Sequence, residues 1–165
     1  FVFFFCLVGQ VMAETSIEVR FGESPPHLYL LQDGVIQASY MVAIARPSIK
    51  FRLPVEGKAT QVWLHAPWYP TQLSRDVYAA QHGGKILPAM VPYGDPRNLM
   101  GVGKIILVFP PGWTSKPLRI HGTTEPGSIG KRISGGCVRM FDADFVDLAH
   151  RPELVQLPIK IHFRK

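Results

Sequence analysis

The chain has 165 residues, of which 47% are hydrophobic, and its formal net charge at pH 7 is +6. This hydrophobic fraction is enough for the buried core of one domain, and it excludes an intrinsically disordered or fibrous protein. Lys and Arg are scattered and no aromatic-basic motif of a nucleic-acid-binding module is present, so we expect no nucleic-acid partner.

The first thirteen residues, FVFFFCLVGQVMA, are apolar and uncharged. The run is too short to span a bilayer comfortably, and we interpret residues 1–13 as the core of a signal peptide, truncated at its start and cleaved after Ala13. The alternative is an ordinary buried strand. Because the sequence has no internal repeat and no linker, we expect residues 14–165 to form a single domain of an exported protein.

Strand-forming residues dominate the mature chain. Residues 17–21, 28–32 and 35–44 are rich in Ile, Val, Leu and Tyr, and the dipeptide Asp33-Gly34 between the last two segments predicts a β-hairpin. Further strands are predicted at residues 60–65, 104–109, 118–121 and 159–163, the last with Ile159, Ile161 and Phe163 on one face.

Helical signals are fewer. One helix is predicted from Thr71 to Gln81, and a second from Asp142 to His150, with Asp142 as its N-cap. The sequence therefore predicts a mostly β fold, sandwich-like or barrel-like, with two or three short helices.

Removal of a signal peptide would take Cys6 with it and leave Cys137 as the one thiol of an exported protein, where structural cysteines usually pair. A cysteine nucleophile reacts as its thiolate and needs a base, and His121 lies sixteen residues earlier. The alternative is that both residues are ordinary buried side chains. A zinc site that adds His150 and His162 is disfavoured, because no two of these residues have metal-ligand spacing on one element, and we expect no metal and no cofactor.

The segment from His121 to Met140, HGTTEPGSIGKRISGGCVRM, resembles the signature of the L,D-transpeptidase catalytic domain of the YkuD type, which includes ErfK-like proteins. In that family HGT is followed by SIG and then by S-x-GC-[IV]-R-M. The likeness extends upstream through residues 66–71, 87–88 and 91–101, and downstream to the closing strand. It covers most of residues 60–163 and the N-terminal hairpin loosely.

The resemblance implies a β-rich fold with Cys137 as nucleophile at the base of a groove and His121 as its base, oriented by the carbonyl oxygen of Gly122. It also places Arg139 near the substrate and lets Ser134 support the loop before the nucleophile. The alternatives are a salt bridge from Arg139 to an aspartate of the following helix, Asp142 or Asp144, and a plain turn role for Ser134.

The oxyanion of the reaction needs hydrogen-bond donors, and we expect the backbone amides of Gly136 and Cys137 to supply them. Many family members have a histidine two residues before the nucleophile, where this chain has Gly135, so a second imidazole donor is absent. Among the aromatic residues we expect Tyr93 to contact substrate.

The resemblance further implies a reaction on peptidoglycan stem peptides in the periplasm or cell envelope of a bacterium. The Cys137 thiolate would form a thioester with the third-position residue of a stem tetrapeptide and release D-alanine. The acyl group would then pass to an amine, either of another stem, giving a 3→3 cross-link, or of a lysine in an envelope lipoprotein. The alternatives are hydrolysis of the same bond and a catalytically weak wall-binding module.

Overall fold

A computed structural model describes residues 13–165. The expected signal peptide, apart from Ala13, lies outside the described residues. The elements are β1 (Thr15–Arg20), β2 (His27–Gln32), β3 (Val35–Met41), β4 (Ile44–Ala45), β5 (Val55–Leu64), α1 (Gln72–Gln81), β6 (Gly103–Val108), β7 (Arg119–His121), the 3₁₀-helix η1 (Pro126–Ser128), β8 (Arg132–Ser134), β9 (Val138–Arg139), α2 (Asp142–Ala149), the 3₁₀-helix η2 (Pro152–Gln156) and β10 (Ile159–Arg164). Within residues 13–165, no helix is both long and apolar enough to cross a membrane.

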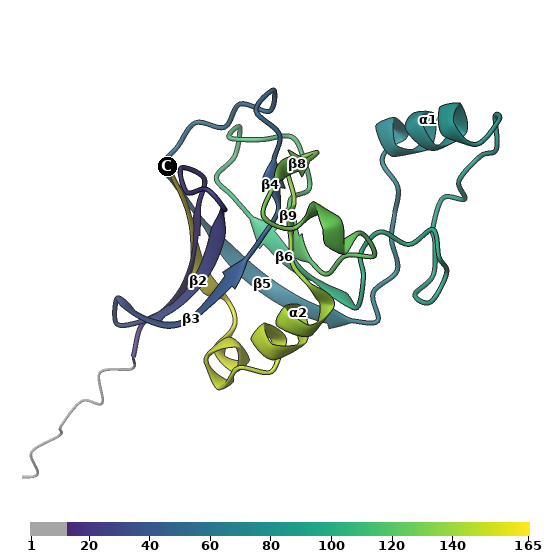
Figure 1. Ribbon diagram of the computed structural model, residues 1–165. Coiled ribbons are helices and arrows are strands. Elements are labelled where there is room, and N and C mark those ends of the chain that lie inside the picture. Colours follow the sequence, from purple (N-terminus) through teal and green to yellow (C-terminus); the bar gives the residue numbers. More distant parts are fainter. Residues whose placement is uncertain (1–12) are drawn as a thin grey trace, which may run out of the picture.

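Eight strands form one strongly curled sheet in the order β3-β2-β1-β10-β5-β6-β7-β9, and β4 pairs with β8 in a small second sheet (Figure 1). The strand β1 pairs in parallel with β10, so the two ends of the described chain are joined at the centre of the sheet. At one edge β7 pairs in parallel with β9, which puts His121 opposite Arg139. This edge carries both halves of the sequence signature.

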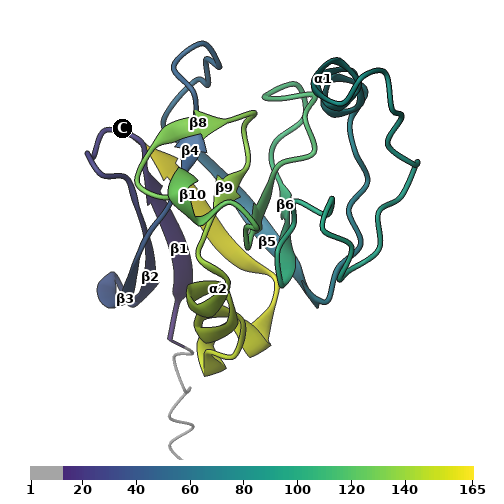
Figure 2. The ribbon, with the colours of Figure 1, turned by 45° about the vertical axis from the view of Figure 1, so that its right-hand side comes forward.

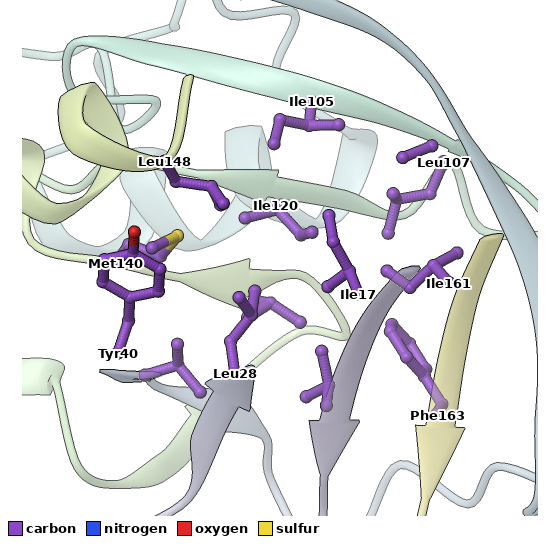
Figure 3. Close-up of a cluster of buried hydrophobic side chains, with 14 of the residues drawn as sticks. Ile17, Leu28, Tyr40, Ile105, Leu107, Ile120, Met140, Leu148, Ile161 and Phe163 are labelled. Atoms are coloured by element: carbon purple, nitrogen blue, oxygen red, sulfur yellow. The ribbon is translucent and has the colours of Figure 1, made fainter. Parts of the chain in front are cut away.

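The concave side of the sheet is filled by alternate side chains of its strands. In β10 the residues Ile159, Ile161 and Phe163 are buried while their neighbours are more exposed, as the period-two pattern predicts. Helix α2 covers this core with Phe145 and Leu148, both fully buried, and Figure 3 shows the side chains of the strands and of α2 meeting there. Each such buried side chain contributes about 1.5–3 kcal/mol of transfer free energy.

The predicted fold class is confirmed, and the hairpin turn lies where the sequence places it. Asp33 and Gly34 both have positive φ, 50° and 77°, as a tight two-residue hairpin turn requires. The predicted strand at residues 35–44 is wrong in one respect, because it breaks after Met41. Ala43 then pairs with Arg139, and Ile44 begins β4 beside β8.

Both predicted helices are present, but their N-termini differ from the prediction. Thr71 caps α1, since its Oγ1 accepts the amide of Ser74 at 3.2 Å. In α2 the N-cap residue is Phe141, so the prediction that Asp142 caps this helix is wrong. The Asp142 carboxylate instead accepts backbone amides from the loop before β6 and from the turn after β7, as described below.

Residues 65–102 form a long excursion between β5 and β6, which carries α1 away from the sheet (Figure 2). The excursion has its own small apolar cluster, which consists of Trp68, Leu87, Val91 and Met100. Buried Asn98 joins separate segments of the excursion next to the sheet, because Nδ2 of Asn98 donates to the carbonyl oxygens of Ala66, Val91 and Pro92 at 3.1–3.2 Å. The excursion therefore has a fixed base, although none of the residues of α1 is buried.

Candidate active site

Cys137 and His121 line one cavity of about 350 Å³ at the β7–β9 edge of the sheet. His121 is the last residue of β7, and Cys137 immediately precedes β9. The rest of the lining comes from the excursion, with Trp68, Thr71, Leu73, Ser74, Leu99 and Met100, from the segment before β7, with Lys116, Pro117 and Leu118, and from Ser134, Gly135 and Arg139. The cavity thus lies between the sheet edge and the excursion.

The orientation of His121 is set by its own backbone neighbour. Its Nδ1 lies 2.5 Å from the carbonyl oxygen of Gly122, which is the contact that the family resemblance implies. A carbonyl only accepts, so Nδ1 carries the proton and Nε2 is left as the basic nitrogen. The residue as a whole is 3% exposed.

The turn that carries Gly122 is anchored by Asp142. Oδ1 of Asp142 accepts the backbone amides of Val102 and Thr123, each at 3.0 Å. The fit is tight, because a Cβ added to Gly122 would lie 2.1 Å from the same oxygen. Asp142 therefore connects the start of α2 to the loop before β6 and to the turn that aims the imidazole.

The surroundings of His121 disfavour its charged form. Burial is the main cause that lowers its pKa to about 4, and the positive charges of Arg139 and Lys104 act in the same direction, while the Gly122 carbonyl opposes them. Arg139 and Lys104 are the β-sheet partners of His121 on its two flanking strands. At neutral pH His121 is therefore a neutral imidazole, available as a base.

Cys137 is partly exposed at the cavity and unpaired. Burial of the thiol raises its pKa, and this outweighs the opposing effects of the Arg119 backbone amide, which faces the sulfur, and of the charges on Arg119, Arg139 and Lys116. The resting pair is thus a neutral thiol and a neutral imidazole.

Ser134 ties the loop before the nucleophile together. Its buried hydroxyl donates to the carbonyl oxygen of Cys137 at 2.6 Å and accepts the amide of Gly136 at 3.1 Å. The Gly136 amide is therefore occupied within the loop, whereas we expected it to face an oxyanion. Gly136 has φ of 138°, which a residue with a side chain rarely adopts, so the loop conformation requires glycine here.

Gly135, where many family members have histidine, lines the cavity and leaves open space. A Cβ added to this residue would meet no atom within 4 Å. Its carbonyl oxygen accepts from Nζ of Lys116 at 3.3 Å, so a lysine that was not among the expected site residues reaches the loop before Cys137.

Arg139 forms a salt bridge, but neither with Asp142 nor with Asp144. Its Nη1 donates to Oε2 of Glu125 at 2.6 Å, and the two side chains lie beside a second cavity of about 630 Å³. Trp68, Leu73, Ser74, Leu99, Gly135 and Arg139 line both cavities. The two cavities therefore adjoin each other.

Tyr93 lies outside these cavities. Its ring packs on His65 with 4.5 Å between the ring centroids, and it does not line either cavity. Its contact with substrate stays a prediction. Within residues 13–165, no three side chains of the His, Cys, Asp and Glu type are placed to hold a metal ion. His150 contacts the carbonyl of Val146, and His162 lies 3.6 Å from Glu56.

No family model matches the chain. Among curated proteins, the probable L,D-transpeptidase ErfK/SrfK of Salmonella typhimurium is 36% identical over 99 residues, which are 56% of this chain and 29% of that protein. The putative L,D-transpeptidase YkuD of Bacillus subtilis is 57% identical over 30 residues, 18% of each chain.

Solved structures extend the likeness over nearly the whole chain. The catalytic domain of an E. faecium L,D-transpeptidase acylated by ertapenem has a TM-score of 0.57 at 15% identity and covers 92% of this chain and 98% of that domain. This chain has the L,D-transpeptidase catalytic fold. An L,D-transpeptidase of Mycobacterium smegmatis gives a TM-score of 0.59 at 11% identity, with 93% of this chain and 59% of that chain covered.

The resemblance to L,D-transpeptidase catalytic domains that the motifs predict is therefore confirmed in sequence and in fold. The chain spans less than a third of the ErfK/SrfK relative, so the L,D-transpeptidase likeness concerns one part of that longer protein.

Proposed function

We propose that this chain is a peptidoglycan L,D-transpeptidase in which Cys137 is the nucleophile and His121 its base. The observation that carries the proposal is that both residues of the family signature line one cavity, with the imidazole held by the Gly122 carbonyl. Support comes from the L,D-transpeptidase names of the sequence relatives and from the neighbour that ertapenem acylates.

The first half-reaction acylates the enzyme. Nε2 of His121 takes the thiol proton as Sγ of Cys137 attacks the carbonyl carbon of the third residue of a stem tetrapeptide. The C–S bond forms, the oxyanion collapses, and the C–N bond to the terminal D-alanine breaks. His121 returns its proton to the leaving nitrogen, so that free D-alanine departs and a thioester remains.

The second half-reaction transfers the acyl group. An acceptor amine attacks the thioester carbon, His121 accepts a proton from the nitrogen, and the C–S bond breaks. The sulfur then recovers the proton and the thiol is restored. The narrow cavity favours an amine over water, because an amine held in line reacts as an intramolecular partner.

The oxyanion needs donors that the structure leaves available. The Gly136 amide is bound to Ser134, so the amide of Cys137 remains as the backbone candidate. Arg139, which is 18% exposed in its side chain, adds positive charge beside the reacting carbonyl and suits the carboxylate of the departing D-alanine.

Two acceptors fit this chemistry, namely the side-chain amine of another stem, which gives a 3→3 cross-link, and a lysine of an envelope lipoprotein. Hydrolysis by water is the alternative reaction. A wall-binding module with weak turnover is a second candidate, favoured by the absence of the second imidazole at Gly135. Since peptidoglycan lies outside the cytoplasmic membrane, the proposal places the protein in the periplasm or cell envelope.

The proposal is tested by following acylation by ertapenem and by a stem tetrapeptide with intact-protein mass spectrometry. We expect one adduct per chain on Cys137, no adduct on Cys137→Ala, and acylation slowed by about a hundredfold or more in His121→Ala. His150→Ala is the matched control, because His150 is an exposed histidine at the end of α2 and should react as the wild type does. An unmodified wild type, or equal acylation of Cys137→Ala, would overturn the assignment.

A further inference from the structure

The second cavity contains charged side chains beyond those that the proposed acylation uses. Arg46, Arg97 and Arg139 line it, together with His82. Arg97 is already paired with Asp95 at 2.6 Å. Among all described side chains that line the two adjoining cavities, Glu125 carries the one carboxylate.

Glu125 is held in place by its backbone, and its side chain is partly exposed although it pairs with Arg139. Its amide donates to Oγ1 of Thr123 at 3.0 Å, and its carbonyl accepts the hydroxyl of Ser128 at 2.7 Å. The side chain is 56% exposed although one oxygen accepts Nη1 of Arg139. A carboxylate with a fixed Cα and an accessible second oxygen is suited to bind a ligand from the cavity.

In the second half-reaction, a positively charged acceptor enters the cavity beside Glu125. The incoming amine must occupy the position that the departing nitrogen left, since both lie on the same side of the acyl carbon. An alkyl amine arrives at neutral pH mostly as an ammonium ion, and the lining side chains that carry a full charge, other than Glu125, are the cations Arg46, Arg97, Lys116 and Arg139. Like charges in a partly desolvated groove repel, so an ammonium needs an anionic contact on its way to Cys137.

We propose that Glu125 binds the ammonium group of the acyl acceptor and so selects amines over water at the thioester stage. This rests on the proposed transpeptidase function. Glu125 holds the ammonium beside Arg139, the ammonium loses one proton to solvent, and the free amine attacks the thioester carbon. A C–N bond forms and the C–S bond breaks, while His121 moves the second nitrogen proton to sulfur.

In this proposal Glu125 discriminates between acceptors by their charge rather than by their size. An acceptor that is cationic in solution uses Glu125, and a nucleophile that is neutral at the same pH does not. Arg139 next to Glu125 also suits an acceptor whose amine carbon bears a carboxylate, because each charge of such a zwitterion then meets its opposite.

The test measures how the acylated enzyme partitions between acceptors. The donor is a stem tetrapeptide, and the acceptors are glycinamide, largely an ammonium ion at neutral pH, and methoxyamine, which is uncharged. In Glu125→Gln we expect the ratio of glycinamide product to hydrolysis product to fall about fivefold, while the methoxyamine ratio stays within about twofold of wild type. Glu125→Lys should lower the glycinamide ratio further.

Glu56→Gln is the matched control, because Glu56 lies on β5 and pairs with His162 rather than with the cavity. Partition ratios are independent of how fast the thioester forms, so a change in acylation does not imitate the effect. Equal losses with both acceptors, or no loss with glycinamide, would overturn the role of Glu125. An absence of thioester on wild-type Cys137 would instead refute the proposed function, and the two failures are therefore distinguishable.

Discussion

Replacement of Asp142 should damage both the stability of the fold and the aim of His121. In Asp142→Ala the amides of Val102 and Thr123 lose their shared acceptor. Each of these two part-buried amides left without a partner costs about 1–3 kcal/mol, so we expect a loss of about 2–6 kcal/mol in the free energy of unfolding. Asp142→Asn keeps an oxygen at the same place and loses only the charge, which should cost about 1 kcal/mol.

Urea unfolding measures the stability of the three proteins, and the rate of ertapenem acylation at low temperature measures the site while each protein is still folded. A role in aiming the imidazole predicts slower acylation in Asp142→Ala than in Asp142→Asn, beyond any difference in folded fraction. If Asp142→Ala unfolds at the urea concentration of wild type, or acylates at its rate, the anchoring of the Gly122 turn by this carboxylate is wrong.

Two further predictions concern the nucleophile and its base. The pKa of His121 is about 4 in the folded protein, whereas in the unfolded chain it is about 6.5. The unfolded chain therefore takes up a proton first, and the free energy of unfolding should fall by about 3 kcal/mol from this residue as pH drops from about 6.5 towards 4. The urea midpoint of His121→Gln should fall less over the same pH range, and an equal fall would contradict this cause. Ser134→Ala should lower the free energy of unfolding in urea by about 1–3 kcal/mol and slow acylation, because the Gly136 amide and the Cys137 carbonyl lose their shared partner. Wild-type stability together with a wild-type acylation rate would contradict the role of Ser134 in holding this loop.

The fold was largely predictable because strand-forming residues dominate the chain and some strands, such as β2 and β10, alternate in burial. Strand β10 alternates buried and more exposed residues, and Asp33-Gly34 fixes the hairpin by local backbone preference. The short strands β8 and β9 were not predictable, since two or three residues give no period. The break after Met41 was also not predictable, because the apolar residues Ala43 and Ile44 suit a continuation of β3 as well as they suit pairing with distant strands.

In the site, the ordered motif could locate Cys137 and His121, but it could not determine which groups their neighbours bond. The Gly136 amide donates to the Ser134 hydroxyl. Arg139 forms its salt bridge with Glu125 rather than with Asp142 or Asp144, which are closer in sequence. Asp142 shows the cause most clearly. An aspartate at the start of a helix normally caps it, yet here its carboxylate accepts amides 40 and 19 residues away, which only tertiary packing decides.

The electrostatics of the site bear on how the nucleophile is activated. Many cysteine enzymes store a thiolate beside an imidazolium, but here burial and two flanking cations keep His121 neutral, and burial keeps the Cys137 thiol protonated. No carboxylate orients the ring, whose Nδ1 meets the Gly122 carbonyl instead. Under the proposed mechanism, proton transfer therefore accompanies attack on a bound substrate, whose developing oxyanion offsets the imidazolium charge. Under that mechanism the neutral thiol reacts slowly with other electrophiles, and reactivity depends on a substrate that fills the cavity between the sheet edge and the excursion.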